Sequence, residues 1–443
     1  MYDYKGKIQN YFKDTWSSLG TLVFWLIAGS VTGAVVGLVG VGFHYAIASL
    51  TGIRNEYNGI IFLLPVGGLL IVWLYKAAGL EKDKGTNAVI LAVRENEELP
   101  FRRAVLIFVS TVITHFLGGS AGREGAALQI GGSLAASGSR FIKQDKKQSK
   151  MFVMCGMSAC FSALFGTPVT AAIFSIEVIS VGIMHYSAII PCVISAITAY
   201  EISVGLGVVP TSFSIRMVPE LHEITILKII PFAVACALAS RFFCFIIHRI
   251  KHIMQGYIPN PYIRVLTGSA VIIALTLAVG DQRFNGAGGE IITESFSVRM
   301  AFYYWILKLL FTAVTLGCGF KGGEIVPAFY VGATFGSFAS EFFGINYSFG
   351  AGLGLIALFC GATNCPVASL LMSIELFGVD AIPYFALICG ISYLVSGDTG
   401  LYGEQKIMYS RKMPVFINRT LRNKKTEPIS DEVQSDKNKT SES

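Results

Sequence analysis

Long runs of residues without a single Asp, Glu, Lys or Arg constrain this chain more than any other feature of its sequence. The longest is Thr15–Ile53, and Phe342–Ile374 is nearly as extended. One membrane span needs about 20 apolar residues, so each run must hold more than one element or one long, tilted helix. Only 14% of the residues are charged, against about 25% in soluble chains. The sequence therefore predicts an all-α polytopic membrane protein.

Basic residues gather in four segments between or beside the apolar runs: Lys5–Lys13, Arg140–Lys150, Arg249–Lys251 and the tail from Lys406. The positive-inside rule places such segments in the cytoplasm, so both termini are expected there. The formal charge of +7 is then a matter of membrane topology, and no nucleic-acid partner is expected. Nothing before Thr15 resembles a cleavable signal peptide.

The nine cysteines lie in or beside apolar runs and form no Cys-x-x-Cys pair. They are predicted to be small buried residues, with no disulfide framework, no metal site and no cofactor. His115 also lies in an apolar segment. It is expected to be a hydrogen-bonded core histidine rather than a proton relay.

The two halves of the chain match one another. Pro168–Glu177 and Pro366–Glu375 are identical at five of ten positions, and Gly122–Ala126 aligns with Gly323–Pro327 at nearly the same offset. Two motifs in the same order favour an internal repeat, and broken apolar segments in matching places are typical of a transporter site at a repeat interface. We predict a cytoplasmic N-terminal segment, a first membrane repeat, a connecting loop, a second membrane repeat and a disordered cytoplasmic tail over residues 1–17, 18–206, 207–221, 222–410 and 411–443.

One charged motif, Gly122-Arg123-Glu124-Gly125, stands between apolar segments, and no further charge follows until Arg140. A carboxylate at membrane depth is unfavourable by about 2.5–3.5 kcal/mol, so Glu124 is a functional candidate. The glycines let the backbone approach a ligand closely. The residues after them indicate a helix start, which favours an anion. The alternative is a charged loop at a membrane surface.

Four motifs, taken in order, resemble the CLC family of chloride channels and anion/proton exchangers: Gly85–Val89, Gly122–Gly125, Gly322–Pro327, and Tyr402 after Ser396–Gly400. The resemblance implies an inverted-topology repeat with many tilted and half-spanning helices, a homodimer, and one anion pathway in each subunit. It assigns the gate and proton carrier to Glu124. It assigns closure of the inner side of the pathway to Tyr402. The predicted anion-binding residues are Thr86, Asn87, Gly122, Arg123, Gly125, Gly323, Glu324, Ile325 and Tyr402.

Three departures from the chloride-selective members resemble the fluoride/proton antiporter branch of that family: Asn87 in the first motif, Ala126 in place of a proline, and Glu324 in the third motif. The replacement of proline at position 126 resembles that branch, but alanine there and Thr86 in the first motif are not the residues expected in it. Fluoride is small and strongly hydrated, so it needs compact donors, and the Asn87 amide offers two N–H groups. A protonated Glu324 would add an O–H donor and a second proton site.

The leading function is therefore export of fluoride in exchange for protons across the cell inner (plasma) membrane. A chloride or nitrate exchanger or channel of the same fold is the alternative, favoured if Asn87 and Glu324 face away from the pathway. A third class, an intramembrane serine protease using Ser120, needs a histidine within reach of the hydroxyl. We expect that the protein is not an enzyme.

The remaining charged residues carry weaker expectations. Lys321 either pairs with Glu324 or faces the cytoplasm, and Arg123 holds its loop through backbone carbonyls. Glu177 and Glu375 are expected at helix ends that meet water.

Proton-coupled chloride exchangers of the family often carry a second Glu directly after the position of Glu177, where this chain has Val178. A two-glutamate relay with that spacing is therefore unavailable. We expect Glu124 to deliver its proton by moving inward, helped by Glu324.

Overall fold

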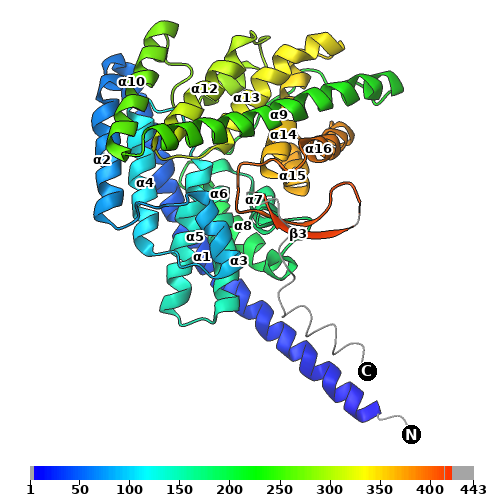
Figure 1. Ribbon diagram of the computed structural model, residues 1–443. Coiled ribbons are helices and arrows are strands. Elements are labelled where there is room, and N and C mark those ends of the chain that lie inside the picture. The colour runs from blue at the N-terminus through cyan, green and yellow to red at the C-terminus, as the bar shows by residue number, and fades with distance from the viewer. Residues whose placement is uncertain (1–3, 414, 422–443) are drawn as a thin grey trace.

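The computed structural model describes residues 4–413 and 415–421, which are mostly helical (Figure 1). The first half holds α1 (Tyr4–Glu56), α2 (Leu64–Ala77), α3 (Thr86–Glu95), α4 (Phe101–Phe116), α5 (Glu124–Phe141), α6 (Lys146–Phe165), α7 (Pro168–Glu177) and α8 (Ile189–Gly205). The second half holds α9 (Glu223–Tyr257), α10 (Pro261–Val279), α11 (Gly289–Glu294), α12 (Tyr303–Cys318), α13 (Ile325–Ala339), α14 (Tyr347–Thr363), α15 (Pro366–Phe377) and α16 (Ile382–Ser396).

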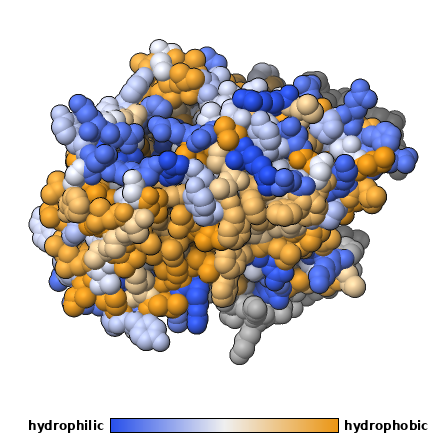
Figure 2. Space-filling view, turned by 90° about the horizontal axis from the view of Figure 1, so that it is seen from above, coloured by the Kyte–Doolittle hydropathy of each residue, from blue (hydrophilic) through white to orange (hydrophobic). Residues whose placement is uncertain are grey.

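Several helices are too short to cross a bilayer alone. Within the described residues, five helical segments are long and apolar enough to do so: Lys13–Glu56, Asn58–Ala77, Tyr186–Gly205, Glu223–Tyr257 and Pro261–Val279. By contrast α7 has 10 residues, which at about 1.5 Å per residue reach about half of a 30 Å hydrocarbon core. Figure 2 shows a broad hydrophobic surface with hydrophilic residues gathered along one side of it. The prediction of a polytopic helical protein with half-spanning helices is confirmed.

The helix α1 runs unbroken through residues 4–56, so it crosses the boundary predicted between residues 17 and 18. Its N-terminal part extends away from the helical body (Figure 1). Deeper in the molecule, small residues let α1 approach α8 closely. A methyl group at Gly33 would lie 2.5 Å from the Ser195 carbonyl oxygen, and one at Gly37 would lie 3.0 Å from Ala199 Cα. Small residues four apart are the usual means of close helix packing in membranes.

Equivalent helix pairs of the two halves pack in the same way. In the first half, a methyl group at Gly131 on α5 would lie 1.9 Å from the Gly156 carbonyl oxygen on α6. In the second half, one at Gly336 on α13 would lie 2.1 Å from the Gly350 carbonyl oxygen on α14. Each pair therefore depends on glycine for backbone-to-backbone contact, as expected if the halves are structural repeats.

A small sheet closes the described chain. Its order is β1 (Ser180–Val181), β2 (Lys406–Tyr409) and β3 (Phe416–Thr420), with β1–β2 parallel and β2–β3 antiparallel. The disorder predicted from residue 411 is wrong for the described part of that segment, because β3 pairs with β2. Arg411 also donates to the Tyr393 carbonyl and to Asn364 Oδ1, both at 2.8 Å. Residues 422–443 of the predicted tail lie outside the described residues.

Candidate functional site

The second and third motifs meet through their backbones. Gly122 N–H donates to the Gly323 carbonyl at 2.7 Å, and Gly323 N–H donates back to the Gly122 carbonyl at 2.7 Å. Directly after this bridge, α5 begins at Glu124 and α13 begins at Ile325. Two helix N-termini, one from each half, therefore start side by side. Free N–H groups at such ends favour anions.

This junction has no room for a side chain. We expect Gly323→Ala to reduce the predicted anion transport strongly and to lower the free energy of unfolding by about 1–3 kcal/mol, because overpacking forces backbone shifts. The added methyl would lie 2.4 Å from Gly125 N and 2.9 Å from Gly125 Cα. Thermal unfolding of the solubilised protein and fluoride efflux measure the two effects. Gly20→Ala is the control, since nothing lies within 4 Å of its Cβ position. Equal behaviour of the two variants would contradict the prediction.

Glu124 lies folded back over the start of its own helix. Its side chain is 1% exposed, Oε2 accepts from Arg123 N at 3.1 Å, and Arg123 Nε donates to Oε1 at 3.4 Å. Arg123 also donates to the Leu164 carbonyl at 3.2 Å, which agrees with its predicted role of holding the loop. A fourth contact, from Arg123 Nη1 to His44 Nδ1 at 2.9 Å, was not predicted. The sequence could have indicated it, because Thr15–Ile53 contains no Asp, Glu, Lys or Arg and His44 is its one histidine.

The first motif begins α3 beside this junction. Gly85 has φ +61°, which favours glycine, and Thr86 follows as the first helical residue. Thr86 Oγ1 lies 3.4 Å from the Gly125 carbonyl oxygen. The position of a methyl group on Gly125 would be 3.3 Å from Glu324 Oε2 and 3.5 Å from Thr86 Oγ1. A hydroxyl from the first half and a carboxyl from the second half therefore meet over Gly125.

Asn87 connects this helix start to the loop that carries Tyr402. Its Oδ1 accepts from Glu404 N at 3.1 Å. Because the backbone N–H needs an acceptor, this bond fixes the oxygen side of the amide, and the two N–H donors remain on the other side. Asn87 lines the same cavity as Glu324 and Tyr402.

Two cavities approach the junction, and their lining residues do not overlap. The larger, of about 1280 Å³, is lined by Thr86, Asn87, Glu324 and Tyr402 among others. The smaller, of about 970 Å³, is lined by Arg123 and Glu124 among others. Each cavity is therefore lined by one of the two central carboxyl groups.

Four residues that line the larger cavity each have one buried polar atom without a hydrogen bond among the described residues. These atoms are the Tyr75 hydroxyl, Gln129 Oε1, Glu324 Oε2 and the Tyr402 hydroxyl. Tyr402 is 2% exposed, so its side chain lies inside the protein and not at the membrane surface. A buried polar group left unpaired is unfavourable by about 1–3 kcal/mol, so such atoms indicate a ligand or water at this place.

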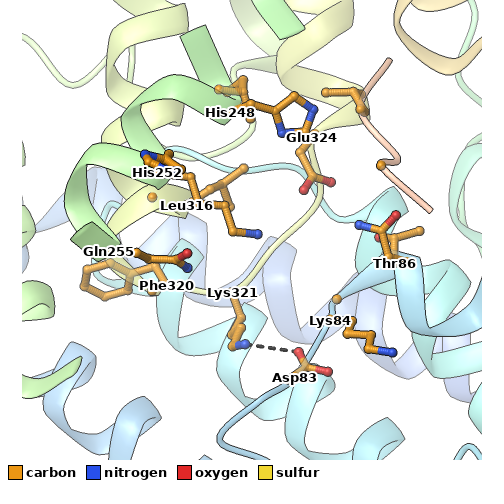
Figure 3. A pocket seen from close by; sticks show the side chains of 18 of the residues that line it. Asp83, Lys84, Thr86, His248, His252, Gln255, Leu316, Phe320, Lys321 and Glu324 are labelled. Atoms are coloured by element: carbon orange, nitrogen blue, oxygen red, sulfur yellow. Dashed lines mark hydrogen bonds and ion pairs between the residues drawn. The ribbon is translucent and has the colours of Figure 1, made fainter. Parts of the chain in front are cut away.

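Lys321 does not pair with Glu324. Its Nζ lies 3.1 Å from Asp83 Oδ2, and the side chain lines the larger cavity (Figure 3). Pairing with Glu324, one of the two expectations for this lysine, is therefore wrong. Asp83 was not predicted, because it lies in a run of alternating charges that resembles a solvated loop.

Glu177 and Glu375 cap one another's helices across the repeat. Glu177 accepts from Val367 N at 3.1 Å and Ala368 N at 2.8 Å, at the start of α15. Glu375 accepts from Val169 N at 2.9 Å and Thr170 N at 2.8 Å, at the start of α7. The expectation that both carboxylates meet water is wrong for Glu177, which is 6% exposed. The matching decapeptides, each from Pro to Glu, were the signal for this exchange.

The histidine and cysteine predictions have simple outcomes. His115 is buried, and its Nδ1 lies 2.8 Å from the Thr111 carbonyl oxygen. The Ser120 hydroxyl shares a hydrogen bond of 3.0 Å with Thr312 and none with His115, so a serine–histidine pair does not form there. All nine cysteines are buried and free, as predicted.

Residues 67–397 match the family described as voltage gated chloride channel. A protein of Pseudomonas syringae pv. tomato named chloride/fluoride channel protein is 33% identical over 394 residues, which cover 87% of each chain. The crystal structure of a CLC-type fluoride/proton antiporter superposes with a TM-score of 0.83 at 30% identity, over 86% of this chain and 97% of that one. A slow cyanobacterial Cl−/H+ antiporter superposes with a TM-score of 0.69 at 16% identity, over 84% and 94%, and shares the fold.

Proposed function

Because this chain belongs to the voltage-gated chloride channel family, we propose that it is a secondary transporter that exchanges fluoride for protons. The observation that carries the proposal is that Asn87 and Glu324 line one cavity, with Glu324 Oε2 buried and unpaired. The chloride alternative required both residues to face away from the pathway. The likeness to the CLC-type fluoride/proton antiporter, with a TM-score of 0.83 at 30% identity, supports the same assignment.

The proposed fluoride site lies between the three helix starts. The Asn87 amide and a protonated Glu324 supply compact donors, and Thr86 Oγ1 lies over Gly125 beside the Glu324 carboxyl. Gly122, Arg123, Gly125, Gly323 and Ile325 contribute the backbone of the two central helix starts, and Tyr402 closes the end of the larger cavity. Small, strongly hydrated fluoride requires such donors to replace its water.

Glu124 is the proposed gate and proton carrier. In the smaller cavity it takes a proton, leaves the backbone N–H of Arg123, and frees the helix starts for an anion. Inward movement past the Gly122–Gly323 bridge brings the proton toward Glu324. Fluoride leaving the cytoplasm is thereby exchanged for an entering proton.

The protein spans the membrane several times. We propose the cell inner membrane, with both termini and the larger cavity on the cytoplasmic side. Arg249 and Lys251, which the positive-inside rule places in the cytoplasm, line that cavity.

We also propose a homodimer with one pathway in each subunit. Apolar side chains on α8 and α16 are exposed, among them Ile190 at 49%, Ile197 at 46% and Leu394 at 48%. A mass measurement of the detergent-solubilised protein tests this arrangement, and a monomer at all concentrations would contradict it.

Flux from loaded liposomes tests the transport function. With potassium fluoride inside, we expect fluoride efflux to drive proton uptake, read by a fluoride electrode and an external pH electrode. With chloride inside, the same protein should release little anion and move few protons. Comparable chloride release, or fluoride release without proton uptake, would contradict the proposal.

Asn87→Ser should lower the fluoride flux by at least about tenfold, because a hydrogen bond to a charged ligand contributes about 1.5–3 kcal/mol. The fold should survive, since serine still offers an acceptor near Glu404 N. Glu324→Ala should likewise reduce the fluoride flux much more than it disturbs the fold. Asn58→Ser, at an exposed position in the smaller cavity, is the control. Normal fluoride flux with chloride still excluded in both variants would remove these residues from the site.

A further inference from the structure

Asp83 is a buried acid that the proposed mechanism does not use. Its side chain is 1% exposed and lies between two cations, Arg103 and Lys321. The Lys321 Nζ is 3.1 Å from Asp83 Oδ2 and 4.0 Å from the centre of the Tyr75 ring. The loop that carries Asp83 and the helix α2 that carries Tyr75, both in the first half, thus hold one ammonium that belongs to the second half. A cation over an aromatic face and beside a buried carboxylate is strongly localised.

The positions of this ion pair in the chain are informative. Asp83 lies two residues before Gly85 in the first motif, and Lys321 lies three residues before Glu324 in the third. Figure 3 shows Lys321 directed at Asp83 and away from Glu324. Lys321 and Glu324 nevertheless line the same cavity, and Glu324 Oε2 has no partner among the described residues.

An ammonium placed on Glu324 would change its chemistry. A close cation favours the ionised form of a carboxyl group, and an ionised Glu324 neither donates to fluoride nor holds a proton. We propose that Asp83 is a positioning residue that holds the Lys321 ammonium away from Glu324, leaving this carboxyl free to take and release a proton. The inference rests on the proposed fluoride/proton exchange, because it concerns the carboxyl that serves it.

Other groups around Glu324 stay in place in the test. Lys251 of α9 lines the same cavity as Glu324. His248 of α9 bonds the Gly400 carbonyl at 2.8 Å, and Arg264 of α10 bonds the Ile258 carbonyl at 3.2 Å. On the other side of the junction, Glu124 is paired with Arg123. The variants below leave all of these unchanged. Asp83→Asn also removes the acid that Arg103 contacts, so the double variant, which keeps that loss but lacks the Lys321 ammonium, assigns the shift in the pH profile to Lys321.

Three variants in fluoride-loaded liposomes separate this role from a structural one. Asp83→Asn frees the Lys321 ammonium to reach Glu324 and keep this carboxyl ionised. A charged hydrogen bond of that kind should lower fluoride/proton exchange by at least about tenfold. Its pH profile should move to lower pH, because a carboxyl beside an ammonium takes a proton only in a more acidic medium. Lys321→Met removes the ammonium, leaves Asp83 paired with Arg103, and should stay within about threefold of the wild type. The double variant should recover most of the exchange that Asp83→Asn loses.

The control is Lys84→Met in the same loop, whose partner Glu97 lies 2.6 Å away with both side chains well exposed. It should leave exchange and pH profile unchanged. A double variant no better than Asp83→Asn, an unshifted pH profile, or a Lys321→Met protein that loses exchange would each overturn the inference. If Asp83→Asn does not fold, the Lys321→Met result decides alone. A wild type that moves fluoride without protons would instead refute the proposed function, so the two failures are distinct.

Discussion

Glu124→Gln should reduce proton uptake driven by an outward fluoride gradient to the level of protein-free liposomes. Glutamine keeps the shape of the side chain but neither ionises nor carries a proton. The Glu124 side chain is 1% exposed and accepts a hydrogen bond from Arg123 N, beside the backbone junction of the two halves. Since α5 contains no other carboxyl group, no neighbour on this helix can carry the proton in its place. Proton uptake and fluoride efflux are recorded together in one liposome suspension.

Glu290→Gln is the matched control for this experiment. Glu290 is an exposed acid that lines the same smaller cavity, so its loss tests the charge of the cavity without touching the junction. We expect its proton uptake to remain near the wild-type rate. Uptake at that rate in Glu124→Gln would show that Glu124 is not the carrier.

The second large effect is a ranking of Glu324→Gln and Glu177→Gln. Glu324→Gln should slow or uncouple exchange, because the unpaired carboxyl oxygen at the cavity end is then no proton site. Glu177→Gln should leave exchange coupled, because both oxygens of Glu177 are occupied by the N–H groups that start α15. It should instead lower the free energy of unfolding by about 1 kcal/mol, the usual size of a lost helix cap.

Glu375→Gln is the control for that ranking, since it removes the equivalent cap from α7. The two cap variants should unfold at similar, slightly lowered temperatures and both retain proton coupling. The opposite ranking, with Glu177→Gln uncoupled and Glu324→Gln normal, would restore a separate inner proton site at Glu177.

The sequence predicts well those features that depend on local pattern. Charge-free runs indicate the helices, and glycines beside Glu124 and Glu324 mark two helix starts that the structure brings together. Their meeting follows from the repeat, because matching motifs in two halves are typical of a shared interface.

Contacts that depend on distant partners could not be predicted in this way. Asp83 appears among alternating charges as a surface residue, and only folding places it between Arg103 and Lys321. The segment around β3 has the polar composition of a disordered tail, yet β2 and the Asn364 side chain give its backbone and Arg411 their partners. The composition of a segment indicates only whether its own side chains can form a core. Here the partners that order the segment come from other elements, β2 and Asn364 at the C-terminal end of α14.

The exchanged caps have a consequence for how the chain is made. Neither α7 nor α15 has a side-chain cap from its own N-terminal flank, Thr167 or Cys365. During synthesis α7 leaves the ribosome long before Glu375 is made. The N–H groups of Val169 and Thr170 therefore lack their carboxylate acceptor until the second half of the polypeptide has been synthesised. Completion of the first half is therefore a late event in biogenesis. Two separately translated halves should become stable only when they are produced in the same cell.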